Sequence, residues 1–290
     1  MPKAITSLEG FIRKLANLHE ANPGIQLLFR GHSKKTYGLS PSIFRNENHI
    51  KSEHLMIRQL VAQHPSDFAQ DRWIFDQLVR AQHYGLPTRL LDVTLNPLVA
   101  LYFAVASQPG SRGSVVIFKP EVGRQKYYDS DAVSCLSALA LMTYSEKESM
   151  RVDASDVLKN HTDKKNRALD SVLLEKFNNI EVVQKLIQLV RQEKPDFRPI
   201  IQPIDLARPI AVVPKKMHAR ILAQNGSFIL FGLARKPNTA NMAHIEHEEI
   251  DIDQSSKTKF LKELSAVGIT ESSMFPEIER AALAIKGRYA

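Results

Sequence analysis

The feature that most constrains the fold of this chain is a helical segment, residues 127–194, that separates two groups of strand-like segments. Apolar and β-branched runs of strand length occur before it and again after it. The predicted strands are residues 25–29, 88–94, 114–118, 209–213, 227–233 and 244–252. Because strands from both ends of the chain surround the helical segment and no change of composition marks a linker, we predict one α+β domain over residues 1–290, with residues 127–194 as a helical insertion.

Apolar residues at helical spacing predict further helices outside the insertion. These helices cover residues 8–18, 50–63, 68–84, 97–106 and about the last forty residues. Ser7 is expected to cap the first of them. Asn96 and Pro97 are expected to begin the fourth, because an Asn side chain accepts a bond from the first turn and the fixed φ of Pro suits the first helical position.

Composition narrows the class of protein and its compartment. Lys and Arg number 39 against 31 Asp and Glu, a net charge of +8 that favours polyanions such as RNA or DNA but is equally typical of ordinary soluble proteins. The single cysteine, Cys135, excludes a disulfide framework within the chain and fits a reducing compartment. The longest apolar run, residues 98–106, is far shorter than the roughly 20 residues that cross a bilayer. With no signal-peptide pattern, we expect a cytoplasmic protein without a membrane segment.

The first motif of chemical interest is LLFRGHS, in which a predicted strand ends in Arg30 and Gly31. Glycine lets the backbone approach a ligand closely, and a guanidinium is suited to bidentate contact with phosphate or carboxylate. The alternative is that Arg30 pairs with a structural carboxylate such as Asp92. These two residues alone do not decide between a ligand site and an internal ion pair.

A longer phrase, QHYGLPTRLLDVTLNPLVALYFA, is more specific, because it places many polar side chains between two apolar helices. These side chains are His83, Tyr84, Arg89, Asp92, Thr94 and Asn96. Together with FRG at residues 29–31, YGLSPS at residues 37–42 and Arg45, the phrase resembles the FRG-domain family. RILAQNGSF at residues 220–228 and GITESSMFPEIE at residues 268–279 look like later motifs of that family, so the resemblance extends over nearly the whole chain. It identifies a site and implies no settled activity.

A second resemblance supplies a chemistry. ADP-ribosyltransferases of the arginine–serine–glutamate type carry a strand with a Tyr/Phe-Arg-Gly-like phrase, a strand ending in a Ser-Thr-Ser-like phrase, a helix with an Ala-Phe-Ala-like core and a further strand. This chain is similar in its order of Arg30, residues 92–94, residues 102–104 and residues 115–118. The resemblance implies an ADP-ribosyltransferase-like split β-sheet core, with NAD as a substrate.

The same resemblance implies roles for individual residues. Arg30 would hold the NAD diphosphate, with Gly31 and Arg89 also in contact with the dinucleotide. Thr94 and Tyr84 would shape the nicotinamide pocket.

The catalytic glutamate of these transferases aligns with Gln224, which can hydrogen-bond a ribose but cannot take a proton or offset positive charge. Asp92 is then the candidate carboxylate that stabilises a cationic ribosyl centre, and His83 the candidate general base, although a histidine near a helix end is more often structural. An RNA or DNA acceptor would suit the basic surface. A toxin or phage-defence role would follow, with an antitoxin or chaperone protein as a restraining partner.

The rival hypothesis is a binding module without catalysis. In it Arg30, Arg89, Arg220 and His83 form an anion pocket for the phosphate of a nucleotide or nucleic acid, and no carboxylate is needed. A third, purely structural role would leave Arg30 paired inside the core. We expect no metal site, because the HIEHEE run at residues 244–249 alternates between the two faces of a strand and is typical of an exposed polar edge strand.

Overall fold

The computed structural model describes residues 4–160, 171–233, 245–277, 282 and 286. Its strands form one seven-stranded sheet in the order β4-β5-β6-β2-β1-β3-β7. The strands are β1 Leu28–His32, β2 Leu90–Thr94, β3 Gly113–Pro120, β4 Gln125–Tyr127, β5 Ile210–Val213, β6 Gly226–Leu230 and β7 Ile245–Ile252. Neighbours are antiparallel except β4 and β5, which run parallel. The fold is therefore α+β, as predicted.

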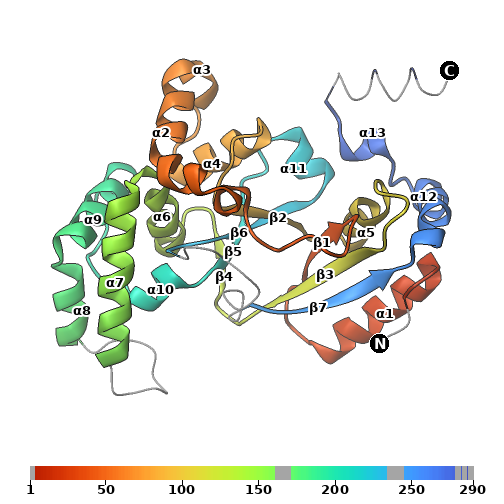
Figure 1. Cartoon of the computed structure of the whole chain (residues 1–290), viewed down its shortest axis with the longest axis horizontal. Coiled ribbons are helices and arrows are strands. Elements are labelled where there is room, and N and C mark those ends of the chain that lie inside the picture. The colour runs from red at the N-terminus through yellow and green to blue at the C-terminus, as the bar shows by residue number, and fades with distance from the viewer. Residues whose placement is uncertain (1–3, 161–170, 234–244, 278–281, 283–285, 287–290) are drawn as a thin grey trace.

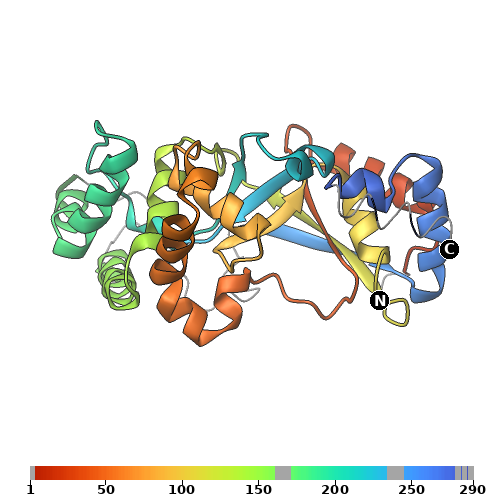
Figure 2. The same ribbon diagram turned by 90° about the horizontal axis from the view of Figure 1, so that it is seen from above.

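Most of the helices lie at the two ends of the sheet, and α4 and α11 lie over its middle (Figure 1). They are α1 Leu8–Ala21, α2 Glu47–Gln63, α3 Pro65–Phe68, α4 Ile74–His83, α5 Pro97–Val105, α6 Asp131–Ala138, α7 Tyr144–Asn160, α8 Ser171–Asn178, α9 Glu181–Glu193, α10 Pro203–Ala207, α11 Ala219–Ala223, α12 Lys257–Ala266 and α13 Glu271–Met274. Helices α6 to α10 lie beyond β4 and β5, whereas α1, α5 and α12 lie at the end formed by β1, β3 and β7, an arrangement that Figure 2 shows from above. None of the described helices is long and apolar enough to cross a membrane.

Two apolar clusters cover the two halves of one sheet face. The first joins Leu90, Ile210 and Leu230 to helices α2, α4, α6, α7 and α9. The second joins Phe29 and Ile117 to α1, α5 and α12. The alternate residues of the same strands form a third cluster on the opposite face, as the two-residue period of a strand requires. The helices of the predicted insertion thus share a core with the half of the sheet that contains β5 and β6.

The two halves of the sheet are joined weakly at its centre. Strands β1 and β2 form a single residue pair, Phe29 with Thr94. By contrast, β1 makes five pairs with β3, and β2 makes five with β6. Strands β1 and β2 therefore diverge beyond Phe29 and Thr94, and their facing edges leave an opening in the sheet.

Several local predictions are confirmed. Each of the six predicted strands overlaps an observed one, although β1 begins three residues later than predicted, and the structure adds the short strand β4. The Ser7 side chain accepts a bond from the Gly10 amide at the start of α1, and Asn96 accepts one from the Leu98 amide at the start of α5. Strand β7 is an edge strand, as the HIEHEE run predicts; His244 itself lies outside the described residues.

The predicted continuous helix over residues 68–84 is wrong. The chain forms α3, then a turn, then α4. The turn is held by the buried Asp71 carboxylate, which accepts bonds from Arg80 Nε and Nη2 at 2.5 and 2.9 Å. Helix α4 begins where the Ile74 amide donates to Glu193 Oε2 of α9, at 2.7 Å. Both contacts are tertiary, so the periodicity of this segment alone could not reveal the break.

Candidate functional site

A cleft of about 190 Å³ lies at the opening between β1 and β2. Its lining residues come from the two diverging strands, from α5 and from the end of α11. They are Phe29, Arg30, Gly31, Asp92, Val93, Thr94, Val99, Phe103 and Gln224. The fold thus brings Arg30, Asp92, Thr94 and Gln224 to one place, as the sequence predicts.

Arg30 stands in the middle of β1, not at its end, which corrects the sequence prediction. Its Nη1 donates to the main-chain carbonyl of Asp92, which faces the opening, and its Nε donates to His32 Nε2 at 3.1 Å. Burial lowers the pKa of the Arg30 guanidinium, while Asp92 raises it and Arg45 lowers it. Since an arginine stays protonated in proteins, the opening contains a fixed positive charge that is about one-fifth exposed.

Position 31 requires glycine for a packing reason that was not predicted from the sequence. A Cβ at this position would lie 1.9 Å from the Ala100 carbonyl oxygen and 2.7 Å from the Ala104 amide nitrogen. Helix α5 therefore rests directly on the backbone of β1 at Gly31. The close approach that glycine permits here is to this helix, although Gly31 also borders the cleft.

Asp92 is the carboxylate that faces the cleft. Its Oδ1 accepts a bond from Gln82 Nε2 at 2.8 Å, and Gln82 Oε1 in turn accepts one from the Thr88 hydroxyl. Its Oδ2 lies 3.9 Å from Arg30 Nη1. The Asp92 side chain is 66% exposed, so it is oriented by Gln82 and still open to a ligand. Gln82 is a positioning residue that the sequence analysis had not assigned, although it begins the motif phrase.

Thr94 and Gln224 are both engaged in internal contacts. The Thr94 hydroxyl donates to the Gln224 carbonyl at 2.6 Å and accepts a bond from the Asn96 amide at 3.0 Å. Gln224 caps the end of α11, and its Nε2 donates to the Met274 carbonyl at 3.0 Å. These bonds hold α11 and the segment around α13 against the end of β2. With its Nε2 engaged, the Gln224 side chain has only its amide oxygen left to accept a hydrogen bond from a ligand, and it has no carboxylate.

A second cleft, of about 120 Å³, adjoins the first and shares Asp92, Val93 and Gln224 with it. His83 from α4 and His218 stack here with ring centroids 5.5 Å apart and planes 7° apart. Burial lowers the pKa of both rings; Arg220 adds to this for His83, and Arg80 for His218. The rings are therefore neutral at pH 7, as a base must be. His83 lies where the sequence predicts, whereas His218 was missed because it follows a segment without a motif.

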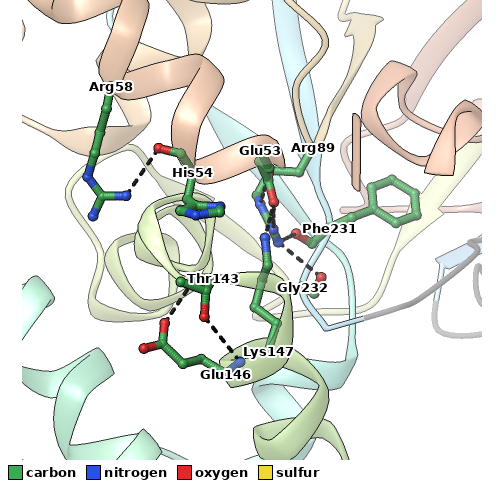
Figure 3. Close-up of polar contacts among 9 residues, drawn as sticks. All are labelled: Glu53, His54, Arg58, Arg89, Thr143, Glu146, Lys147, Phe231 and Gly232. Carbon is green, nitrogen blue, oxygen red and sulfur yellow. Dashed lines mark hydrogen bonds and ion pairs between the residues drawn. The ribbon is translucent and has the colours of Figure 1, made fainter. Parts of the chain in front are cut away.

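Arg89 and Tyr84 lie elsewhere. Arg89 is 1% exposed and forms an interior ion pair, with its Nε and Nη2 donating to the two carboxylate oxygens of Glu53 at 2.9 and 2.6 Å (Figure 3). Its Nη1 donates to the carbonyls of Phe231 and Gly232. Arg89 is thus sealed in the core and cannot contact a ligand, which corrects its predicted role in binding NAD or an anion. Tyr84 is 66% exposed at the end of α4 and lines neither cleft.

His32 and Arg45 are two further residues near Arg30 to which the sequence analysis gave no role. Burial is the main cause that lowers the pKa of His32 to about 4, and the charges of Arg30 and Arg45 add to it. His32 shares a strand face with Arg30 because it lies two positions further along β1, and this spacing is the signal that could have revealed it. Among the described residues, no group of His, Cys, Asp and Glu is arranged to hold a metal ion.

Comparison with known proteins gives one match. Residues 25–112 match the family model of the FRG domain, a range that includes Arg30, Arg45, Gln82 and Asp92. The later motif-like segments, residues 220–228 and 268–279, lie outside the matched range. No curated protein and no solved structure matches the chain.

Proposed function

Since this chain carries an FRG domain over residues 25–112, we propose that the opening between β1 and β2 of that domain binds NAD and that the protein is an ADP-ribosyltransferase. The observation that carries the proposal is the pairing of Arg30 and Asp92 across the opening. The guanidinium supplies a fixed cation for the diphosphate, and the exposed carboxylate lies where positive charge would develop.

The arrangement of the sheet also supports the proposal. The resemblance implies a split β-sheet core, and the two halves of this sheet share a single residue pair, Phe29 with Thr94. Helix α5 follows β2 and packs on β1, and β3 follows α5, in the order that the resemblance implies. This similarity lies in the order of the elements.

The reaction would proceed at C1′ of the nicotinamide ribose. The C1′–N bond breaks and nicotinamide leaves with the electron pair, so C1′ becomes cationic. The Asp92 carboxylate offsets this charge while Gln82 holds its orientation. An acceptor oxygen or nitrogen then forms a bond to C1′, and its proton passes to the neutral His83 imidazole. Water as acceptor gives hydrolysis, and a nucleic acid gives a modified strand; modification of host nucleic acid would suit a toxin or phage-defence effector.

A binding module without catalysis is the second candidate. The binding module is favoured because two of the predicted catalytic residues, Thr94 and Gln224, use their side chains in internal hydrogen bonds. In this case Arg30, Arg220 and His83 would hold a phosphate-bearing ligand, and Asp92 would limit its affinity by like-charge repulsion.

The test uses NAD labelled on the adenylate, mixed with the protein and with RNA, DNA or protein acceptors, with nicotinamide release and transferred label as readouts. We expect Asp92→Asn to retain NAD binding and lose turnover by roughly 100-fold or more, the size of effect seen when one electrostatic stabiliser is removed. Asp196→Asn, at an exposed aspartate after α9, is the matched control and should keep wild-type turnover. Absence of turnover with every acceptor, together with salt-sensitive nucleic-acid binding, would establish the binding module instead.

A further inference from the structure

A third cleft lies on the other side of Arg30 and is larger than the two already described. It has a volume of about 590 Å³ and shares Arg30, Gly31 and Phe103 with the cleft at the opening. Apart from Ser107, its other lining residues come from the end of β1 and from the segment that follows it, including His32, Tyr37 and Arg45. None of the described residues that line it carries a carboxylate.

Two guanidiniums give this cleft a positive charge. Arg45 Nε and Nη2 both donate to the Ser40 carbonyl, at 3.0 and 2.8 Å, which orients the guanidinium while the side chain stays exposed. Arg30 lies at the boundary with the opening. Both charges lower the pKa of His32, after burial, so the field of both arginines reaches the wall of the cleft. His32 remains neutral at pH 7 and contributes no charge of its own.

An aromatic ring lies beside these charges. Tyr37 is 48% exposed, and its ring meets the His32 ring edge-on, with centroids 6.2 Å apart and planes 73° apart. A half-exposed tyrosine next to arginine is the combination on which nucleobases stack while phosphates are held by the cation. A sulfate-like anion would contact only the arginines, whereas a nucleotide would also contact the Tyr37 ring.

The size of the clefts points in the same direction. Pockets that enclose a drug-sized ligand have volumes of about 300 to 1,000 Å³. The opening, at about 190 Å³, has room for one end of a dinucleotide, whereas the third cleft has room for a whole nucleotide. A dinucleotide held by Arg30 must extend from the opening, and the third cleft is the adjoining space that also contains Arg30.

We propose that the third cleft is a nucleotide subsite, in which the base stacks on Tyr37 and the phosphate lies between Arg45 and Arg30. The proposal rests on the proposed function in one respect, the sharing of Arg30 by the two clefts. The nucleotide is either the adenylate half of a dinucleotide or one unit of a single-stranded nucleic acid, and the two present the same chemistry to the cleft.

The experiment measures binding of AMP, of inorganic phosphate and of a short single-stranded oligoadenylate by calorimetry. Arg45→Met should raise the Kd for AMP and for phosphate at least tenfold. Tyr37→Leu should raise the Kd for AMP by a similar factor and leave phosphate binding unchanged. The matched controls are Arg58→Met, at an arginine of α2 outside this cleft, and Tyr127→Leu, at an exposed tyrosine of β4; both should bind like the wild type.

The ligands separate the two sources of the nucleotide. If AMP binds as tightly as the oligonucleotide, the subsite serves a dinucleotide. If the oligonucleotide binds far more tightly, with an affinity that falls steeply with salt, the subsite serves a nucleic-acid strand. Wild-type affinity for AMP in both variants, or no binding of AMP and oligonucleotide to the wild type at millimolar concentration, would overturn the proposal.

Failure here is distinguishable from failure of the proposed function. Release of nicotinamide that depends on Asp92, without any effect of Tyr37→Leu or Arg45→Met on AMP binding, would remove the subsite and keep the transferase. Binding of AMP that depends on Tyr37 and Arg45, without nicotinamide release, would keep the subsite and remove the transferase.

Discussion

We expect Glu53→Gln to destabilise the protein strongly, because Glu53 is the anion of a buried network that joins three parts of the fold. Glu53 lies on α2, Arg89 immediately before β2 and Lys147 on α7 (Figure 3). Arg89 donates two bonds to the carboxylate, and Lys147 Nζ donates one to Oε2 at 2.6 Å. The side chains of Glu53 and Arg89 are 5% and 2% exposed. Glutamine keeps the shape but turns an amide towards two cations.

The magnitude follows from the burial of the partners. Removing one member of a buried ion pair typically costs about 3 to 5 kcal/mol, because a charge is left without compensation. We expect Glu53→Gln to fall in this range. Burial lowers the pKa of Lys147, so this lysine can lose its proton in the variant and soften the loss. The double variant Glu53→Gln with Lys147→Met should therefore recover part of the stability, because it removes one of the two unpaired cations.

Urea unfolding at pH 7, followed by the fluorescence of the single tryptophan, Trp73, measures the free energy of unfolding. The control is Glu246→Gln, which breaks a pair with Lys119 at a glutamate that is 74% exposed. An exposed pair contributes about 0 to 1 kcal/mol. A loss for Glu53→Gln no larger than that of Glu246→Gln would refute the reasoning that these charges stabilise the fold through their mutual burial.

The pH dependence gives an independent check of the same network. Burial alone would raise the pKa of Glu53, but Arg89 and Lys147 overcome it and lower the pKa to about 2, from an ordinary value of 4.5. Because the folded pKa is below the unfolded one, the stabilisation is fully present above about pH 4.5 and is lost as the pH falls towards 2. It amounts to about 3 kcal/mol, and the variant Glu53→Gln should lack this part of the acid dependence.

Two further outcomes follow from the packing. Gly31→Ala should lower the free energy of unfolding by about 1 to 3 kcal/mol, since the added Cβ would overlap the backbone of α5. Gly38→Ala should be close to neutral, because a Cβ added there meets no atom within 4 Å beyond its chain neighbours. Equal urea midpoints for the two variants would contradict this. Cys135 is buried, and burial raises its thiol pKa, so an aromatic disulfide reagent should label it only in urea; rapid labelling of the native protein would show that the thiol is accessible.

The strands were predictable because their residues are locally distinctive. Residues 114–118 and 227–233 are largely apolar or β-branched runs with turn residues beside them; the first lies within β3, and the second lies in β6 as far as Leu230. Strand β4 was missed because Gln125–Tyr127 has no such composition and pairs only through three residues of β5. The break between α3 and α4 depends on the contacts of Asp71 with Arg80, which no periodicity encodes.

The candidate site was predictable only in part, for a related reason. The motifs indicated which side chains are chemically unusual, and Arg30, Asp92 and His83 do line connected clefts. The motifs did not indicate which arginine is accessible to a ligand. Arg30 and Arg89 are each adjacent to strand segments rich in leucine, and local sequence treats them alike.

What separates the two arginines is the position of an acid elsewhere in the chain. Glu53 lies four residues before the buried Ile57, so its side chain is on the same face of α2 as the core, where a carboxylate requires a cation. Arg89 meets this requirement at the edge of the first apolar cluster. Arg30 instead donates to the main-chain carbonyl of Asp92, in an opening that exists only because β1 and β2 share one residue pair. The guanidinium left without a buried carboxylate is therefore the one available to an external anion, and closing the opening by longer pairing of β1 with β2 would remove that availability.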